Sequence, residues 1–252
     1  MKIERLNIYY LKSSVLLWIV ITVLGFSSHV AAQADAGETA TLNPQQQSLI
    51  TIASLTAKGD LENLETALAE GLEADLTVNQ IKEAMVHLYA YCGFPRSLRG
   101  LRTFIKVLDE RKAKGIEDPI GAEATPIEDN RSKYEKGKAN LEELVQRKLD
   151  GPPTDYAQFA PIIEVFLKEH LFADIFERDI LDYRQRELVT VSVLVTIGGV
   201  EPMVRSHMNI CLIQGITPEQ LEELIDTVAR NVEQEKIDSA REVLSSLLKT
   251  KE

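Results

Sequence analysis

Cysteine and histidine are scarce in this chain. Its 252 residues include 2 cysteines and 4 histidines, too few for an array of zinc fingers or for a scaffold held together by disulfides. Cys92 and Cys211 lie far apart in the sequence, and the sequence alone does not decide whether they meet. Residues that break helices are also few, with 13 glycines and 9 prolines. A collagen-like chain is therefore excluded, and long helices are allowed.

Positive charge is deficient as well. Lysine and arginine number 28 against 39 aspartates and glutamates, a formal net charge of −11. A nucleic acid would be repelled over most of such a surface, and the only local group of bases is Arg96, Arg99 and Arg102. The phosphate-binding patterns G-x-x-x-x-G-K and G-x-G-x-x-G are missing. We therefore expect no nucleic-acid partner, and the 44% apolar and 27% charged residues are typical of a soluble globular protein.

One long apolar run lies near the N-terminus. The first 12 residues carry three bases against one acid, residues 15–26 are apolar, and Ala32-Gln-Ala34 follows. This order is typical of a secretory signal, and twelve residues of helix rise only about 18 Å against a hydrocarbon core of roughly 30 Å. We predict a signal peptide over 1–34 and a periplasmic or secreted protein without membrane contact after cleavage. An uncleaved anchor is the alternative, and no cysteine near the cleavage point supports a lipoprotein.

The rest of the chain contains an internal repeat. The sequence Leu42-Asn-Pro-Gln-Gln-Gln-Ser-Leu49 is similar to Leu181-Asp-Tyr-Arg-Gln-Arg-Glu-Leu188, at an offset of 139. After one inserted residue the offset becomes 140, and Leu76-Thr-Val-Asn-Gln-Ile81 matches Ile216-Thr-Pro-Glu-Gln-Leu221. This pattern predicts two related units of four helices, near 42–110 and 181–249.

Helix signals occur in both units. Asn43-Pro44 supplies an N-cap and a first-turn proline, and Thr77-x-x-Gln80 and Thr217-x-x-Gln220 are capping boxes. The β-branched run at 189–195 could form a strand by propensity, but a helix buried on all sides has the same composition. Because helical patterns flank this run, we predict a helix there. The predicted fold class is all-α, with two helical repeats forming one compact bundle.

A polar connection separates the two units. Residues 112–130 are rich in glycine, proline and acids and predict a loop, and residues 140–148 predict a charged helix. An apolar helix over 156–172 is expected to dock on the second unit. The predicted division is a signal peptide (1–34), a first repeat (35–111), a linker with a charged helix (112–155), and a lead-in helix with the second repeat (156–252).

The second unit carries a carboxylate and an imidazole that a helical hairpin can bring together. Glu187 lies early in the buried helix, and His207 follows twenty positions later in the next helix. A carboxylate beside an imidazole fixes the tautomer of the ring and tunes its basicity, as proton transfer near neutral pH requires. We predict these two as catalytic residues. The alternative is that His207 is a polar core residue and Glu187 a surface or capping acid.

The first unit lacks this pair, because Ser48 and Leu68 occupy the matching positions. Its conspicuous stretch runs from His87 to Arg96, where Gly93 and Pro95 break the helix. Tyr91, Cys92 and Arg96 should therefore lie at a helix end, where they line either a pocket or a plain helix junction. We predict Tyr91 and Arg96 as substrate-binding residues. No spacing of histidines and cysteines predicts a metal site.

These residues resemble a known family. The second unit has Arg186-Glu-Leu-Val-Thr, then Gly199-Val-Glu-Pro, His207 and Gly215-Ile-Thr-Pro-Glu-Gln-Leu, and it resembles the repeat of the carboxymuconolactone decarboxylase family. In the first unit, Ala90-Tyr-Cys-Gly-Phe-Pro-Arg-Ser97 looks like the signature that closes that repeat. The resemblance implies an all-α fold that assembles into a homo-oligomer, a trimer or a trimer of dimers. It also implies a small-molecule substrate and no cofactor.

Two activities are known in that family. Its alkylhydroperoxidases need a Cys-x-x-Cys before the histidine, but Val200 and Met203 occupy these positions here, so a peroxiredoxin-like antioxidant enzyme is the weaker alternative. A decarboxylase needs a proton donor and groups that hold the substrate. For it we predict His207 oriented by Glu187, and substrate binding by Arg178, Arg186 and Glu201.

We therefore expect a lyase that acts on a small carboxylated lactone or keto acid by proton transfer. The family's known pathway is cytoplasmic, whereas this chain carries a predicted export signal, so we expect its substrate to be a different small acid or lactone. A further alternative is a non-catalytic oligomeric binding or scaffold protein.

Overall fold

A computed structural model describes residues 41–250. The predicted signal peptide and cleavage point lie outside these residues. Residues 41–250 belong to one compact unit, which contains helices and no strands over these described residues. The predicted all-α class is confirmed. No described helix is both long and apolar enough to cross a membrane.

The first repeat consists of α1 (Pro44–Lys58), α2 (Leu61–Glu73) and the long α3 (Val78–Ala113). A break inside α3 at Gly93, where φ is 80° and ψ is 160°, divides it into two helical parts. The second repeat consists of α7 (Tyr183–Ile197), α8 (Glu201–Ile213), α9 (Pro218–Ala229) and α10 (Gln234–Lys249). The two parts of α3 therefore correspond to α9 and α10, as the predicted four-helix units require.

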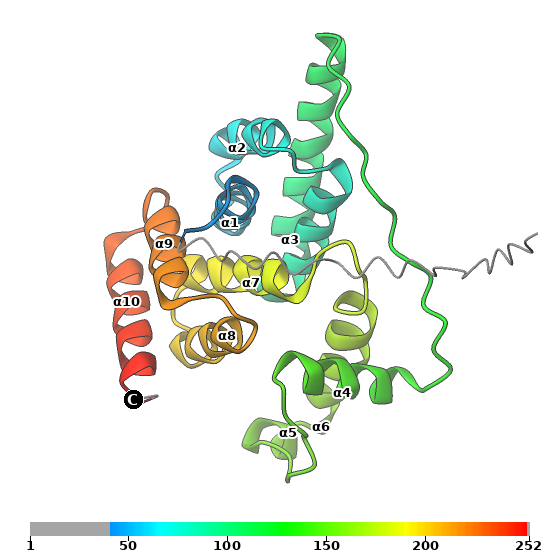
Figure 1. The fold of residues 1–252 in the computed structure, drawn as a ribbon, viewed down its shortest axis with the longest axis vertical. Helices are drawn as coiled ribbons and strands as arrows, with labels where there is room; N and C mark the ends of the chain where they lie inside the picture. Colours follow the sequence, from blue (N-terminus) through cyan, green and yellow to red (C-terminus); the bar gives the residue numbers. More distant parts are fainter. Residues whose placement is uncertain (1–40, 251–252) are drawn as a thin grey trace, which may run out of the picture. The chain divides into compact units, whose positions relative to one another are not determined.

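The three helix starts predicted from caps inside the repeats are confirmed. Asn43, Thr77 and Thr217 are N-caps, and each forms a capping box with a glutamine three residues later. The β-branched run is helical and lies in α7, where every residue from 186 to 196 is buried. Figure 1 shows why this helix is apolar on all sides, because α7 lies in the middle of the bundle with the other helices of the two repeats around it.

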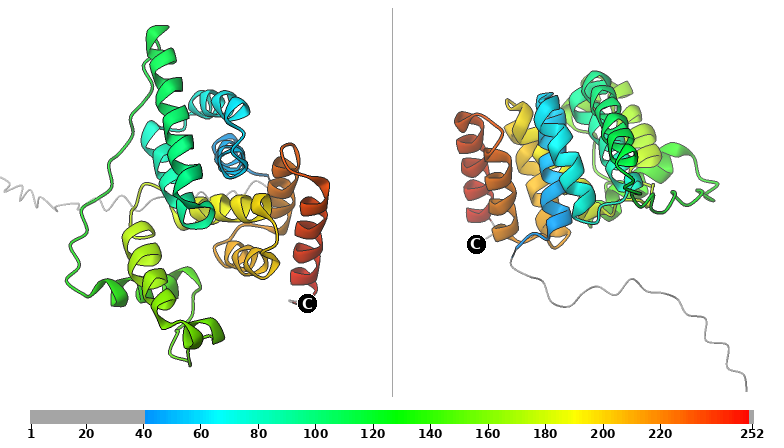
Figure 2. Two further views of the ribbon diagram at one scale, coloured as in Figure 1. Left: turned by 180° about the vertical axis from the view of Figure 1, so that it is seen from behind. Right: turned by 90° about the horizontal axis from the view of Figure 1, so that it is seen from above.

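Each repeat contributes residues to the apolar core of the other. This occurs along α1 and α7, which pack against each other. Leu42 and Ile50 of the first repeat lie in the apolar core of the second. Their counterparts at the offset of 139, Leu181 and Val189, lie in the core of the first. In the right-hand view of Figure 2, α9 and α10 lie on one side of the α1–α7 pair and α3 on the other. The repeats are thus related by an approximate two-fold axis that passes between α1 and α7.

The connection between the repeats departs from the prediction. The charged helix α4 spans Lys133–Leu144 rather than 140–148, and its capping box of Ser132 and Glu135 marks the earlier start. The expected helix over 156–172 is divided into α5 (Asp155–Phe159), α6 (Pro161–Phe166) and the π-helix η1 (Leu167–Ile175). Ala160 interrupts it with φ −131° and ψ 75°, since a residue before proline avoids the helical region.

The docking of this lead-in segment is also different. Phe159 is 93% exposed and Ile162, Ile163 and Phe166 are exposed as well, so these residues do not attach the segment to the second repeat. The contact is made further along, where Phe172 and Phe176 pack with Ile210 of α8 and against Tyr91 of α3. The end of the lead-in segment therefore lies against both repeats.

The linker between α3 and α4 runs back along α3, on the side away from α1 and α2, before it reaches α4 (Figure 1). The backbone N–H of Val78 donates to the carbonyl of Pro119, and that of Asn79 donates to the carbonyl of Ile120. Thr125 donates to the carboxylate of Asp179 from both its backbone and its hydroxyl. These bonds fix the linker beside the start of α3 and beside the segment that precedes α7.

Candidate functional site

Glu187 and His207 contact each other. The Nδ1 atom of His207 lies 2.7 Å from Oε2 of Glu187, and α7 and α8 form the hairpin that brings them together. Gly198 and Gly199, both at positive φ, make its turn. The Glu187 side chain is wholly buried, whereas that of His207 is 16% exposed. With Nδ1 bound to the carboxylate, Nε2 is the ring nitrogen left to exchange a proton with a ligand.

Tyr91 reaches this pair from the other repeat. Its ring meets that of His207 edge to face, with 5.8 Å between the ring centroids. The Tyr91 hydroxyl and the second oxygen of Glu187, Oε1, are buried and form no hydrogen bond with the described residues. Burial raises the pKa of the Tyr91 phenol above its ordinary range, and the charge of Glu187 raises it further, although the Thr190 hydroxyl opposes the shift. The phenol therefore stays protonated and can donate a hydrogen bond.

Arg186 and Arg178 bind a carboxylate of the protein. Both form salt bridges with Glu83 of α3. Arg186 lies 2.8 Å from its carboxylate and is 0% exposed, and Arg178 lies 2.9 Å away and is 40% exposed. Arg186 also donates to the carbonyl of Arg178. Sequence reasoning assigned these guanidinium groups to a substrate carboxylate, but Glu83 occupies that role for Arg186, because a guanidinium without a carboxylate partner could not be buried so completely.

His87 extends this network between the repeats. Arg186 Nη1 lies 3.4 Å from His87 Nδ1, and His87 Nε2 lies 2.8 Å from the Thr190 hydroxyl. Because a guanidinium only donates, Nδ1 accepts and Nε2 carries the hydrogen. The Thr190 hydroxyl donates onward to the carbonyl of Arg186. Burial lowers the pKa of His87 well below its ordinary value, and the charge of Arg186 lowers it further, so the ring is neutral.

Glu83 and Thr190 were missed from the sequence, and His87 was noted only as part of a stretch. One signal could have found Glu83 and His87. Glu83, His87 and Tyr91 follow one another at intervals of four residues, which places them on one face of α3. Polar residues at helical spacing on a face that is otherwise apolar indicate a buried network rather than a solvated surface.

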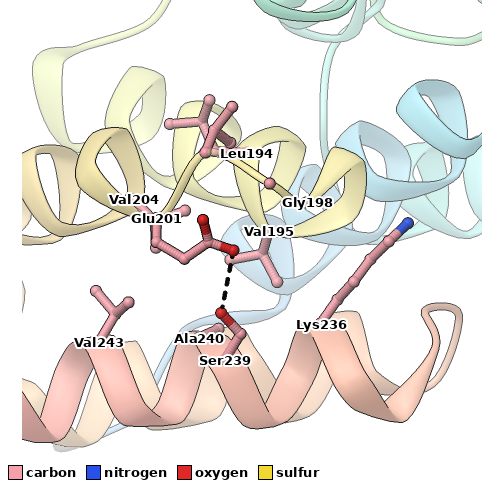
Figure 3. A pocket seen from close by; sticks show the side chains of 11 residues that line it. Leu194, Val195, Gly198, Glu201, Val204, Lys236, Ser239, Ala240 and Val243 are labelled. Atoms are coloured by element: carbon pink, nitrogen blue, oxygen red, sulfur yellow. Dashed lines mark hydrogen bonds between the residues drawn. The ribbon is translucent and has the colours of Figure 1, made fainter.

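Glu201 lies elsewhere. Its carboxylate accepts a hydrogen bond from the Ser239 hydroxyl of α10 at 3.3 Å, beside a cavity of about 20 Å³ between α7, α8 and α10. Figure 3 shows this cavity, with Lys236 extending away from Glu201. The structure therefore does not bring Glu201 to the Glu187–His207 pair as the sequence reasoning expected.

Tyr91, Cys92 and Arg96 line a pocket, one of the two alternatives that the sequence left open. It is a cleft of about 520 Å³ at the ends of α1 and α7, and Lys58 and Lys236 also line it. Neither Glu187 nor His207 belongs to its wall. Tyr91 is thus the residue shared by the cleft and the pair.

The thiols and the acids offer little other chemistry. Cys92 and Cys211 are both free thiols. Burial raises the pKa of Cys92 to about 11 against the opposing charge of Arg96, and burial raises that of Cys211 well above its ordinary value. Among residues 41–250 there is no group of three histidine, cysteine or acidic side chains that could hold a metal ion.

The comparison with known proteins agrees with the repeat and the fold. The model of the "Carboxymuconolactone decarboxylase family" matches residues 28–105 and 165–245, which together make up more than half of the chain and contain one repeat each. No curated protein matches the chain. The two matched regions and the two helical repeats lead to the same conclusion: the chain belongs to the carboxymuconolactone decarboxylase family.

Proposed function

We propose that this protein is a lyase that acts on a small carboxylated lactone or keto acid by proton transfer. The observation that carries the proposal is the 2.7 Å contact between His207 Nδ1 and the buried carboxylate of Glu187. The carboxylate holds the ring in one orientation and one tautomer. Because Nδ1 is bound to Glu187, Nε2 is the ring nitrogen that faces a ligand and transfers the proton.

The proposed reaction breaks the bond between a carboxylate and its neighbouring carbon. Carbon dioxide leaves, and the electron pair of that bond passes into the conjugated carbonyl to form an enolate. His207 transfers its Nε2 proton to carbon, and the imidazole then regains a proton from water. The Tyr91 hydroxyl, which is buried beside the His207 ring, is the donor we assign to the enolate oxygen.

The test is carbon dioxide release from a panel of β-keto acids and carboxylated lactones. We expect turnover of at least one compound above the rate in buffer. His207→Gln should lower that rate by about 100-fold or more, and Glu187→Gln should lower it as well because the ring loses its orienting carboxylate. His170→Gln is the matched control, since His170 is exposed and contacts Asp174 and the ring of Tyr89 rather than the pair.

Two results would overturn this proposal. One is a panel in which no compound is turned over, and the other is a His207→Gln protein as active as the wild type. Either would leave a non-catalytic binding or scaffold protein as the better description.

A thiol peroxidase has less support. The thiolate is the form that attacks a peroxide, and the raised pKa values of Cys92 and Cys211 keep both thiols protonated near neutral pH. We expect Cys92→Ser to consume hydrogen peroxide no differently from the wild type. A peroxidase activity lost in that variant would favour the antioxidant alternative instead.

A further inference from the structure

The cleft that Tyr91 shares with the Glu187–His207 pair lies on the axis that relates the two repeats. At the offset of 139, Ala57 and Lys58 at the end of α1 correspond to Thr196 and Ile197 at the end of α7, and all four line the cleft. At the offset of 140, Cys92 corresponds to Val232, and both also line it. The cleft is therefore formed by equivalent surfaces of the two repeats.

Its most important equivalent residues are two cations. Arg96 corresponds to Lys236, and each lies over the glycine that follows the first helix of its repeat. A Cβ added to Gly59 would meet the Arg96 guanidinium at 1.6 Å, and one added to Gly198 would meet the Lys236 side chain at 3.0 Å. Lys236 donates to the carbonyl of Thr196 at 2.9 Å. Both cations thus lie at helix C-termini, where positive charge is favoured.

Capping does not account for the whole arrangement. Arg96 is exposed and forms no salt bridge with a described residue, and Lys58 adds a third positive charge. The salt-bridge partner of Lys58 is Asp60, 3.4 Å away, which does not line the cleft. Glu233 is the one acid in that wall, 3.2 Å from Lys236. The cleft therefore carries an excess of positive charge in a chain whose net charge is −11.

The remaining wall is apolar or aromatic. Ala57, Ile197, Val232 and the ring of Tyr91 supply a surface for a hydrocarbon body, beside the cations that would bind its charged end. A volume of about 520 Å³ lies within the usual range of small-molecule sites, roughly 300–1,000 Å³. Arginine is the side chain whose two parallel N–H groups match a carboxylate.

We propose that this cleft binds a small organic carboxylate, with Arg96 and Lys236 holding its anionic end and the apolar wall its body. The site shares Tyr91 with the Glu187–His207 pair but contains neither Glu187 nor His207, and it does not depend on the proposed lyase activity.

The test is binding of 4-fluorobenzoate to the full chain, followed by ¹⁹F NMR, with the neutral 4-fluorobenzamide as the matched ligand. We expect the carboxylate to bind and the amide to bind at least about tenfold more weakly, since tenfold corresponds to 1.4 kcal/mol. Arg96→Gln and Lys236→Gln should each weaken binding to a similar extent, and Arg96→Lys should retain part of it. Glu233→Gln should tighten binding because it removes the opposing charge.

Two controls separate this site from its surroundings. Arg99→Gln removes an exposed charge of the same helix that does not line the cleft, so binding should not change. His207→Gln should also bind 4-fluorobenzoate normally, whether or not the lyase is active. Equal binding of the amide, unchanged binding in Arg96→Gln, or loss of binding in His207→Gln would each overturn the proposal.

Discussion

The buried carboxylate of Glu83 is the residue on which the junction of the two repeats depends most strongly. It is 2% exposed and pairs with Arg186, which is 0% exposed. Glu83→Gln retains the size of the side chain and an oxygen that accepts hydrogen bonds, but it removes the charge. Arg186 would then be buried without a counter-ion, a change that costs about 3–5 kcal/mol.

The lower end of that range applies here, about 3 kcal/mol. Arg186 keeps its hydrogen bond to the carbonyl of Arg178, and Arg178 itself is 40% exposed and can be hydrated when it loses its partner. In urea an m-value of about 2–3 kcal/mol/M turns this loss into a fall in the unfolding midpoint of roughly 1–1.5 M. The assay is urea unfolding followed by circular dichroism.

The matched control is Glu73→Gln. Glu73 pairs with Arg111 but is 67% exposed, and Arg111 keeps Asp118 as a second partner at 2.8 Å. This variant should lose less than about 1 kcal/mol. A Glu83→Gln protein as stable as Glu73→Gln would refute the reasoning. The double variant Glu83→Gln/Arg186→Met should recover at least half of the loss, because it removes the uncompensated charge as well.

Three further predictions concern titration and close packing. The pKa of His87 lies well below its usual value in the folded state, so below about pH 6.5 the unfolded chain binds a proton at this residue that the folded protein does not bind. The free energy of unfolding should therefore fall as the pH decreases below about 6.5, by at most about 1.4 kcal/mol per pH unit. His87→Gln should remove this part of the pH dependence between pH 5 and 7.5 in urea titrations. Gly59→Ala and Gly115→Ala place alanine at the same φ of 78°, and each should lower the free energy of unfolding by about 1–2 kcal/mol. Only Gly59→Ala displaces the guanidinium of Arg96 from the cleft, so only this variant should weaken 4-fluorobenzoate binding. A Cβ on Gly137 would lie 1.8 Å from a backbone carbonyl oxygen of η1, so Gly137→Ala should lower the free energy of unfolding by about 1–3 kcal/mol, whereas Gly151→Ala, which meets nothing within 4 Å, should leave it unchanged.

Much of the fold is predictable because its signals are local. A capping box needs only neighbouring residues, and the repeat is found by comparing the sequence with itself. Together they predict the starts of α1, α3 and α9. The contact between Glu187 and His207 is also nearly local, since one helical hairpin brings them together. The catalytic role assigned to the pair stays a prediction that the turnover assay must test.

The missed features depend on contacts between distant parts of the chain. Arg186 was expected to bind a substrate, because no local pattern shows that Glu83, 103 residues earlier, occupies its guanidinium. The apolar residues of α5 and α6 were expected to be buried, yet Phe159 is 93% exposed, because the helix breaks at Ala160 and the packing passes to Phe172 and Phe176. Hydrophobicity along the chain does not indicate which of several apolar turns meets the core.

The two repeats have diverged at one place and remained alike at another. At the Glu187–His207 pair they differ, because Ser48 and Leu68 stand at the equivalent positions of the first repeat, which instead contributes Tyr91 from α3. At the ends of α1 and α7 they are alike, since each repeat places one cation over one glycine. A single asymmetric pair suits a reaction that needs one proton donor per chain, whereas two equivalent cations on opposite sides of the axis suit the two equivalent oxygens of a carboxylate. Arg96→Gln and Lys236→Gln should therefore weaken carboxylate binding by similar factors, and a strongly unequal loss would show that the cleft is not used symmetrically.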